Sequence, residues 1–159
     1  MSVLAGAAIG AGATAVMDLW NLLLRRAFGI PSLDYCLLGR WLLHMPTGTF
    51  RHASIARAES KPYECQAGWI GHYGIGVTLG VAFLILAPAG WLTNPTLPPA
   101  LIFGLVTVVL PYFLLQPALG LGIAGARTPK PAQARVKSLA THVVFGIGLF
   151  ASAWLLSRI

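Results

Sequence analysis

Apolar runs alternate with polar segments along the chain, and four of the runs are about as long as a membrane span. They cover residues 2–24, 67–88, 98–119 and 138–156. A helix needs about 20 predominantly apolar residues to cross a hydrocarbon core about 30 Å thick. We therefore predict an all-α integral membrane protein, a four-helix bundle that forms a single transmembrane domain over residues 1–159.

The third apolar run is rich in proline. Pro98 and Pro99 suit the first turn of a helix, where a missing N–H removes no hydrogen bond. Pro111 and Pro117 lie inside the run, where proline removes a backbone bond and clashes with the preceding turn. The third helix is therefore predicted to bend or break there.

The long segment between the first two runs, residues 25–66, predicts a short amphipathic helix at 33–45. Ser32 can act as its N-cap, and Pro46 ends it. Its apolar face comprises Leu37, Leu38, Trp41 and Leu42. We expect this helix to lie in the membrane interface or against the bundle, and residues 47–66 to be irregular.

Composition supports the membrane assignment. Hydrophobic residues make up 57% of the chain and charged residues 9%, whereas a soluble domain carries roughly 25% charge. The net charge of +7 does not indicate a nucleic-acid partner, because the basic residues lie between apolar runs and not on one folded face. The lipid bilayer is the expected partner, with anionic headgroups beside the basic loops.

The basic residues also predict an orientation. Ten of the eleven lysines and arginines lie in residues 25–66 and 119–137, and only Arg158 lies on the other side. Positively charged loops stay in the cytoplasm, so both termini are expected outside, with Trp91 as an outer-interface anchor. No positive charge precedes the first run, which favours a retained helix over a cleaved signal. Cys36 and Cys65, in a cytoplasmic loop, are expected to be reduced thiols.

Small residues recur every fourth position in three of the runs, which lets helix backbones approach closely in lipid. The stripes also carry ionisable residues: Gly6, Gly10, Thr14 and Asp18; Gly68, His72, Gly76 and Gly80; Ser138, His142 and Gly146. A four-residue step keeps near one helix face. Asp18, His72 and His142 are therefore predicted to point into the bundle.

These three side chains are also predicted to lie at one depth. Counted from the predicted helix ends, each is roughly 6–9 Å below the cytoplasmic boundary. Gln116 falls in the same zone, Asn21 lies one turn from Asp18, and Thr141 adds a hydroxyl. Ionisable groups inside a span are costly and are functional candidates by default. We predict one buried polar layer near the cytoplasmic side.

Several functions could use this layer. It could bind a small ligand, an ion or a proton, in a transport-related role, because His and carboxylate groups relay protons. Asp18, His72 and His142 could instead be ligands of a divalent transition metal in a membrane enzyme. A haem on the two histidines has less support. The layer could also be interhelical hydrogen bonding in a scaffold or accessory subunit.

The segment around Arg51 and His52 has two interpretations. It could be a solvated or lipid-facing loop, or a lid at the cytoplasmic mouth of the polar layer. Four helices are few for an alternating-access monomer, because such folds usually pair repeats, so a homodimer is plausible.

Four stretches of the chain resemble a known family. They are MDLWNLLLRRAFGIPSLDYCLLGRWLLHMPTGTFRHASI, GWIGHYGIGV, PYFLLQPALGLGIAGARTP and SLATHVVFGIGL. Together they resemble the bacterial family known as domain of unknown function 2938, over nearly the whole chain. The resemblance implies a small protein of the bacterial inner membrane and implies no activity. Asp18, His72, Gln116 and His142 all lie within these stretches.

Overall fold

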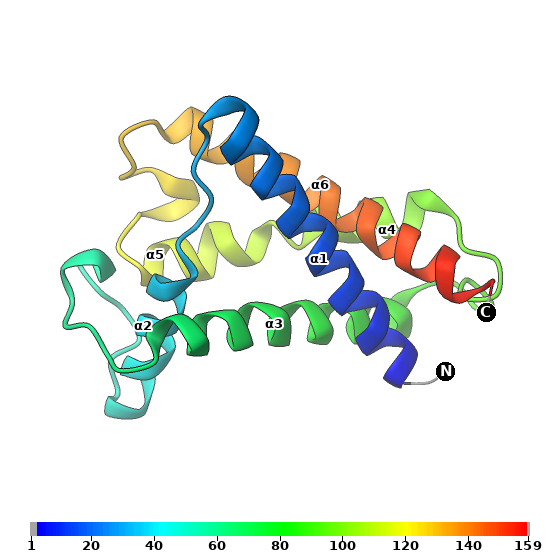
Figure 1. Ribbon diagram of the computed structural model, residues 1–159, viewed down its shortest axis with the longest axis horizontal. Coiled ribbons are helices and arrows are strands. Elements are labelled where there is room, and N and C mark those ends of the chain that lie inside the picture. Colours follow the sequence, from blue (N-terminus) through cyan, green and yellow to red (C-terminus); the bar gives the residue numbers. More distant parts are fainter. Residues whose placement is uncertain (1–2, 159) are drawn as a thin grey trace. The chain divides into compact units, whose positions relative to one another are not determined.

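The computed structural model describes residues 3–158, and within them every regular element is helical. Four of the helical segments are long and apolar enough to cross a membrane: Val3–Phe28 (α1), Glu64–Leu86 (α3), Leu97–Ala118 and Pro131–Leu156 (α6) (Figure 1). This confirms the predicted all-α membrane protein with four spanning helices. Lipid offers no hydrogen bonds to the backbone, so a segment that crosses it must form a helix, which satisfies its backbone hydrogen bonds internally.

The third span is broken in the way the prolines predict. It begins as α4 (Leu97–Val106), passes through a π-helical turn, η3 (Pro111–Leu115), and ends as α5 (Gln116–Ala118). The Gln116 N–H bonds to the Pro111 carbonyl, five residues back. Prolines at 111 and 117 remove two donors, and the wider turn accommodates their rings.

The loop between α1 and α3 contains the predicted short helix, α2 (Tyr35–His44). Its N-cap is Asp34 and not Ser32, because the Asp34 carboxylate accepts a hydrogen bond from the Cys36 N–H at 2.9 Å. Two 3₁₀ turns follow, η1 (Met45–Thr47) and η2 (Ile55–Arg57). A third, η4 (Ile123–Gly125), lies in the loop before α6.

The chain divides into two compact units. Unit 1 comprises Met1–Ser32, Tyr73–Thr107 and Leu139–Ile159. Unit 2 comprises Leu33–His72 and Val108–Ser138. The predicted single transmembrane domain stays a prediction.

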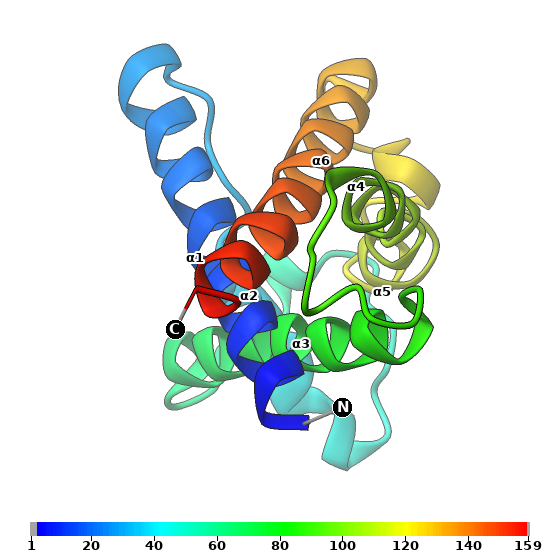
Figure 2. The ribbon, with the colours of Figure 1, turned by 90° about the vertical axis from the view of Figure 1, so that its right-hand side faces the viewer.

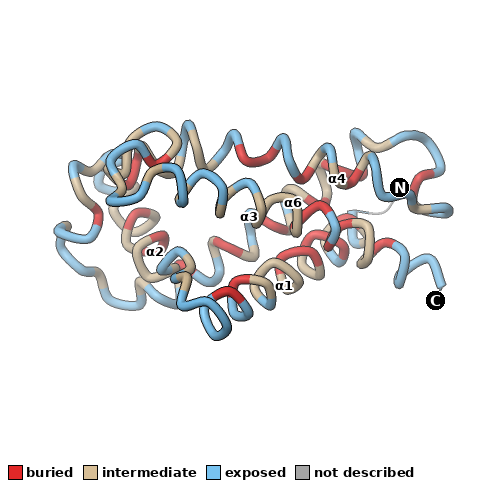
Figure 3. The backbone as a smooth tube through the Cα atoms, turned by 90° about the horizontal axis from the view of Figure 1, so that it is seen from above, coloured by how far each residue is buried: buried red, intermediate tan, exposed pale blue. Residues whose placement is uncertain are grey.

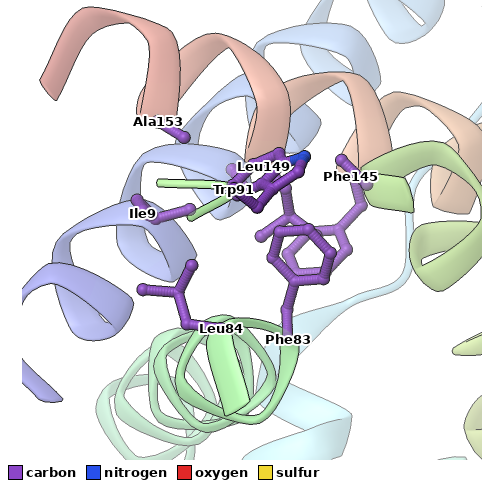
Figure 4. Packing of buried hydrophobic residues seen from close by; sticks show 9 residues of the cluster. Ile9, Phe83, Leu84, Trp91, Phe145, Leu149 and Ala153 are labelled. Carbon is purple, nitrogen blue, oxygen red and sulfur yellow. The ribbon is translucent and has the colours of Figure 1, made fainter. Parts of the chain in front are cut away.

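Unit 1 is built around an apolar core at which α1, α3, α4 and α6 all contribute side chains. Figure 4 shows Ile9, Phe83, Leu84, Trp91, Phe145, Leu149 and Ala153. Trp91, predicted as an outer-interface anchor, is only 5% exposed and packs in this core, where its ring meets Phe83 edge-on at 4.7 Å. Its indole N–H donates to the Thr96 carbonyl at 3.0 Å, so the ring can be buried with its polar atom satisfied.

Small residues set the spacing of the unit 1 helices, as their stripes predict. A Cβ at Gly10 would overlap the Gly76 carbonyl oxygen, so α1 and α3 are in backbone contact there. In the same way α4 lies beside α6 at Gly104 and Gly146 (Figures 1 and 2). Buried positions recur along one face of α1, with exposed positions between them (Figure 3). At these glycines the helices are in contact through their backbones, next to the larger side chains of the core.

Unit 2 has its own core, made of Leu38, Trp41, Ile55, Ala118 and Leu119. The amphipathic helix α2 therefore packs its apolar face into protein, one of the two predicted placements. The Arg40 guanidinium makes a bidentate pair with the Glu64 carboxylate, with both N–O distances 2.8 Å and side-chain exposures of 14% and 15%. It also donates to the Ile55 and Ala58 carbonyls, each at 3.2 Å. One side chain thereby joins α2, the loop and the start of α3.

Cys36 and Cys65 form a disulfide between the first turns of α2 and α3. The prediction of reduced thiols is therefore wrong for this structure. The physical reason is the contact between two glycines. A Cβ at Gly39 would overlap the Glu64 carbonyl oxygen, and one at Gly68 would overlap the Tyr35 carbonyl oxygen. The two backbones come close enough there for the neighbouring cysteines to meet.

Candidate functional site

Asp18 lies in the second half of α1, and its Oδ2 atom is shielded from solvent. A side-chain hydrogen bond joins it to Tyr73 of α3. The phenol donates and the carboxylate accepts, since ionised Asp has no donor. Both residues belong to unit 1. The structure thus gives the predicted carboxylate a specific hydroxyl partner on a different span.

His142 of α6 makes the second polar contact of unit 1. Its Nδ1 atom lies 2.8 Å from the Thr107 hydroxyl oxygen, and that hydroxyl donates to the Gly104 carbonyl at 2.6 Å. Thr107 is 6% exposed and sits where α4 ends. The absence of a side chain at Gly104 leaves room, because a Cβ there would meet the His142 carbonyl oxygen at 2.7 Å. The polar partner of the His142 ring is therefore the Thr107 hydroxyl and not a carboxylate.

Asn21 and Thr141 complete the predicted residues in unit 1. Asn21 is 9% exposed and lies three positions beyond Asp18 on α1, so the two share a side of the helix. Thr141 is half-buried, next to His142. Buried amides and hydroxyls near a carboxylate are typical of a site that orients a polar guest or a proton.

His72 belongs to unit 2 and is 8% exposed. Its ring stacks on Tyr35 of α2, with centroids 4.1 Å apart and 22° between the planes. Trp69 meets Tyr35 edge-on at 4.7 Å and His72 at 6.0 Å. The imidazole therefore lies in an aromatic cluster with Tyr35 and Trp69.

Gln116 begins α5 in unit 2. Its Nε2 donates to the Ser138 hydroxyl at 3.4 Å, a long bond. Its Oε1 is buried and accepts no hydrogen bond from any residue in the described range 3–158. A buried amide oxygen of this kind is costly unless a ligand or water satisfies it. Gln116 therefore stays a binding candidate.

The two mouth residues differ in exposure. Arg51 is exposed, and His52 is partly buried beside His44, with ring centroids 5.0 Å apart. The His52 backbone N–H donates to the Ala118 carbonyl at 2.8 Å. Its Nε2 atom is buried without a hydrogen-bond partner in the described part of the chain. Burial, and then the nearby charge on His44, lower the pKa of His52 below its usual value of 6.5.

This shift predicts a pH effect on stability. The unfolded chain binds more protons at His52 than the folded chain does. The contribution of His52 to the free energy of unfolding should therefore be fully present above about pH 6.5 and be lost as the pH falls below that value. Thermal unfolding of the purified protein at several pH values measures this. The His52→Gln variant should show a smaller decline on the acid side, and an identical pH profile in both proteins would contradict the prediction.

Within unit 1 the structure pairs Asp18 with Tyr73 and His142 with Thr107, and within unit 2 it places His72 on Tyr35 and Gln116 on Ser138. The convergence of all four predicted residues in one layer stays a prediction. The sequence pattern does not single out Tyr73 and Thr107 as the partners of Asp18 and His142. Both could have been found from the sequence, because they are hydrogen-bonding side chains inside apolar runs.

The described residues contain no group of three or more His, Cys, Asp or Glu side chains arranged as metal ligands. The metal interpretation of Asp18, His72 and His142 needs side chains from both units and stays a prediction. Open metal sites need three protein ligands on one face of the ion.

Family comparison covers nearly the whole chain. A model of proteins of unknown function, DUF2938, matches residues 7–156. The chain belongs to DUF2938. The matched range includes every candidate residue above, so the DUF2938 assignment agrees with the resemblance seen in the sequence. Neither the curated proteins nor the solved structures include a match to this chain.

Proposed function

We propose that this DUF2938 membrane protein binds and releases a proton at Asp18 within the bilayer, as part of a transport-related activity. The observation that carries the proposal is the hydrogen bond between Asp18 and Tyr73, on two different spans. A carboxylate inside a span is costly, so it is retained where it serves a polar ligand or a proton. The phenol can donate to the ionised carboxylate and reorient when Asp18 is protonated.

Two further contacts in unit 1 support this proposal. His142, whose Nδ1 atom lies 2.8 Å from the Thr107 hydroxyl oxygen, is a second side chain that can bind a proton. Asn21 supplies a buried amide on the Asp18 side of α1. The proposal assigns proton binding to Asp18, orientation to Tyr73 and Asn21, and proton relay to His142.

The charge distribution supports a proposed orientation. With the loops at 29–63 and 119–130 in the cytoplasm of a bacterium, both termini would face outward across the inner membrane. The short segment between α3 and α4, residues 87–96, carries no charged residue. Anionic lipid headgroups would then lie against the basic loops.

The Asp18→Asn variant tests the proton site. Infrared difference spectra of the reconstituted protein, recorded as acid is added, should show the C=O band of a buried protonated carboxyl group. The band should disappear in Asp18→Asn and shift in Tyr73→Phe, because the tyrosine hydrogen bond to the carboxyl group is lost. The matched control is Asp34→Asn, which changes an exposed carboxylate outside the spans and conserves its capping chemistry.

Two outcomes would reject the proposal. One is a band that survives in Asp18→Asn, and the other is a band in the same position in Tyr73→Phe and the unmodified protein. Either result would favour the scaffold hypothesis, in which these polar contacts only hold helices together.

A further inference from the structure

Unit 2 contains a surface groove of about 340 Å³. It is lined by Phe50 and Arg51 of the loop, by Phe113, Leu114, Pro117 and Ala118 of the third span, and by Ile123. The π-helical turn η3 supplies two of these side chains. Such turns often occur at functional sites, because they change which side chains a helix presents.

The loop that carries Arg51 is held in place by backbone contacts. The His52 N–H donates to the Ala118 carbonyl at 2.8 Å, and the Ile55 N–H donates to the Leu119 carbonyl at 3.1 Å. Gly120 adopts a φ of 86°, and a Cβ there would overlap the Ala53 carbonyl oxygen. The loop therefore rests directly on the end of the third span, and Arg51 starts from a fixed backbone position.

The groove combines apolar surface with one positive charge. Phe113 and Leu114 are 61% and 60% exposed at the end of a helix apolar enough to span a membrane. Phe50 and Ile123 are exposed to a similar extent. In residues 3–158 the ion pairs found use Arg40 and Lys61, and neither involves Arg51. An arginine without a carboxylate partner, next to surface suited to acyl chains, fits an anionic amphiphile.

A second arginine, Arg127, lies beside Gly122 but does not line the groove. The Arg127 side chain packs over Gly122, the residue before Ile123, with its Cγ 3.0 Å from where a Cβ of that glycine would be. The Arg127 N–H donates to the Leu121 carbonyl at 2.8 Å, which fixes this turn. Arginine pairs with phosphate more specifically than lysine does, because its planar fork can donate two parallel hydrogen bonds.

We propose that this groove binds one anionic phospholipid, with the phosphate on Arg51 and an acyl chain along Phe113 and Leu114. A soluble phosphate would gain nothing from the exposed phenylalanine and leucine, whereas a phospholipid buries them. The proposal goes beyond a general attraction of basic loops to membranes, because it assigns one lipid to one arginine. It does not depend on proton binding at Asp18.

Native mass spectrometry of the detergent-purified full chain tests the proposal. The protein is mixed with phosphatidylglycerol or with phosphatidylcholine of the same chain length, and retained lipid is counted. We expect phosphatidylglycerol to be retained preferentially, and Arg51→Gln to weaken its binding about tenfold, as expected for loss of one charge-assisted contact. The matched control is Arg57→Gln, an exposed arginine that does not line the groove.

A second variant tests whether the acyl chain, and not only the headgroup charge, contributes to binding. Leu114→Ser should weaken binding of both lipids, because it removes apolar contact without changing charge. Equal retention by Arg51→Gln and Arg57→Gln would overturn the assignment of the phosphate to Arg51. Equal retention of the two lipids by the unmodified protein would overturn the anionic preference, and full retention by Leu114→Ser would overturn the placement of the acyl chain.

Discussion

Replacing Gly80 with alanine is expected to lower the free energy of unfolding by about 3 kcal/mol, the upper part of the range for overpacked sites. A Cβ on Gly80 would overlap the Gly6 carbonyl oxygen and would lie 2.5 Å from the Cα and N atoms of Gly10. These are backbone atoms of α1, which cannot rotate away as a side chain can. The helices must therefore separate, and the contacts of Gly10 with Gly76 are lost with them.

Gly74→Ala is the matched control, because it makes the same substitution on the same helix. A Cβ at Gly74 meets no atom within 4 Å. Alanine should be neutral or slightly stabilising there, since it forms helix more readily than glycine. Unfolding in detergent, followed by circular dichroism, measures both variants. Equal losses at positions 74 and 80 would show that backbone contact between α1 and α3 is not what stabilises unit 1.

The four spans could be predicted from sequence because lipid leaves the backbone so few options. A run of about 20 apolar residues has to become a helix. The ends were less predictable. α1 continues through Arg25 and Arg26 to Phe28, and α6 begins at Pro131, seven positions before the apolar run. Hydropathy marks where the hydrocarbon ends, whereas a helix can continue into the headgroup region with polar residues.

The candidate site was predictable as a list of residues but not as a set of contacts. His72 and Tyr73 are consecutive on α3, yet the first stacks on Tyr35 and the second bonds to Asp18. A rotation of about 100° per residue separates their directions. The spacing of small residues predicts the packing face only to within such an angle. Partner choice therefore depends on helix rotation, which hydropathy does not fix.

The contacts of unit 2 were the least predictable, because they join segments that are distant in sequence. Cys36 and Cys65 are 29 residues apart, and nothing in their spacing indicates a pair. Their meeting depends on backbone contact at Gly39 and Gly68. The Arg40–Glu64 pair depends on the same contact. In the sequence, the glycines at 39 and 68 are what indicates that α2 and α3 could approach closely enough for these contacts.

Cys36→Ser is expected to destabilise the oxidised protein by about 3.5 kcal/mol, the entropic value for a loop of 29 residues. The disulfide closes the loop that contains α2, so its loss widens the ensemble of the unfolded chain. Thermal unfolding in detergent with and without reductant measures the effect. Reductant should bring the unmodified protein to the level of Cys36→Ser and leave the variant unchanged, and a variant as stable as the oxidised protein would contradict the prediction.

The location of this disulfide also tests the proposed orientation. Disulfides are rare in the cytoplasm and, where present there, are usually transient or redox-sensing. If the basic loops face the cytoplasm, the pair should be open in growing cells and close after a thiol oxidant is added. A membrane-impermeant maleimide should then label Cys36 and Cys65 only after the inner membrane is opened.

A pair already closed in untreated cells, and opened by an impermeant reductant outside, would place these loops outside, since only an oxidising compartment maintains the bond. The orientation expected from the basic residues would then be rejected, because the disulfide reports directly on the compartment that contains these loops.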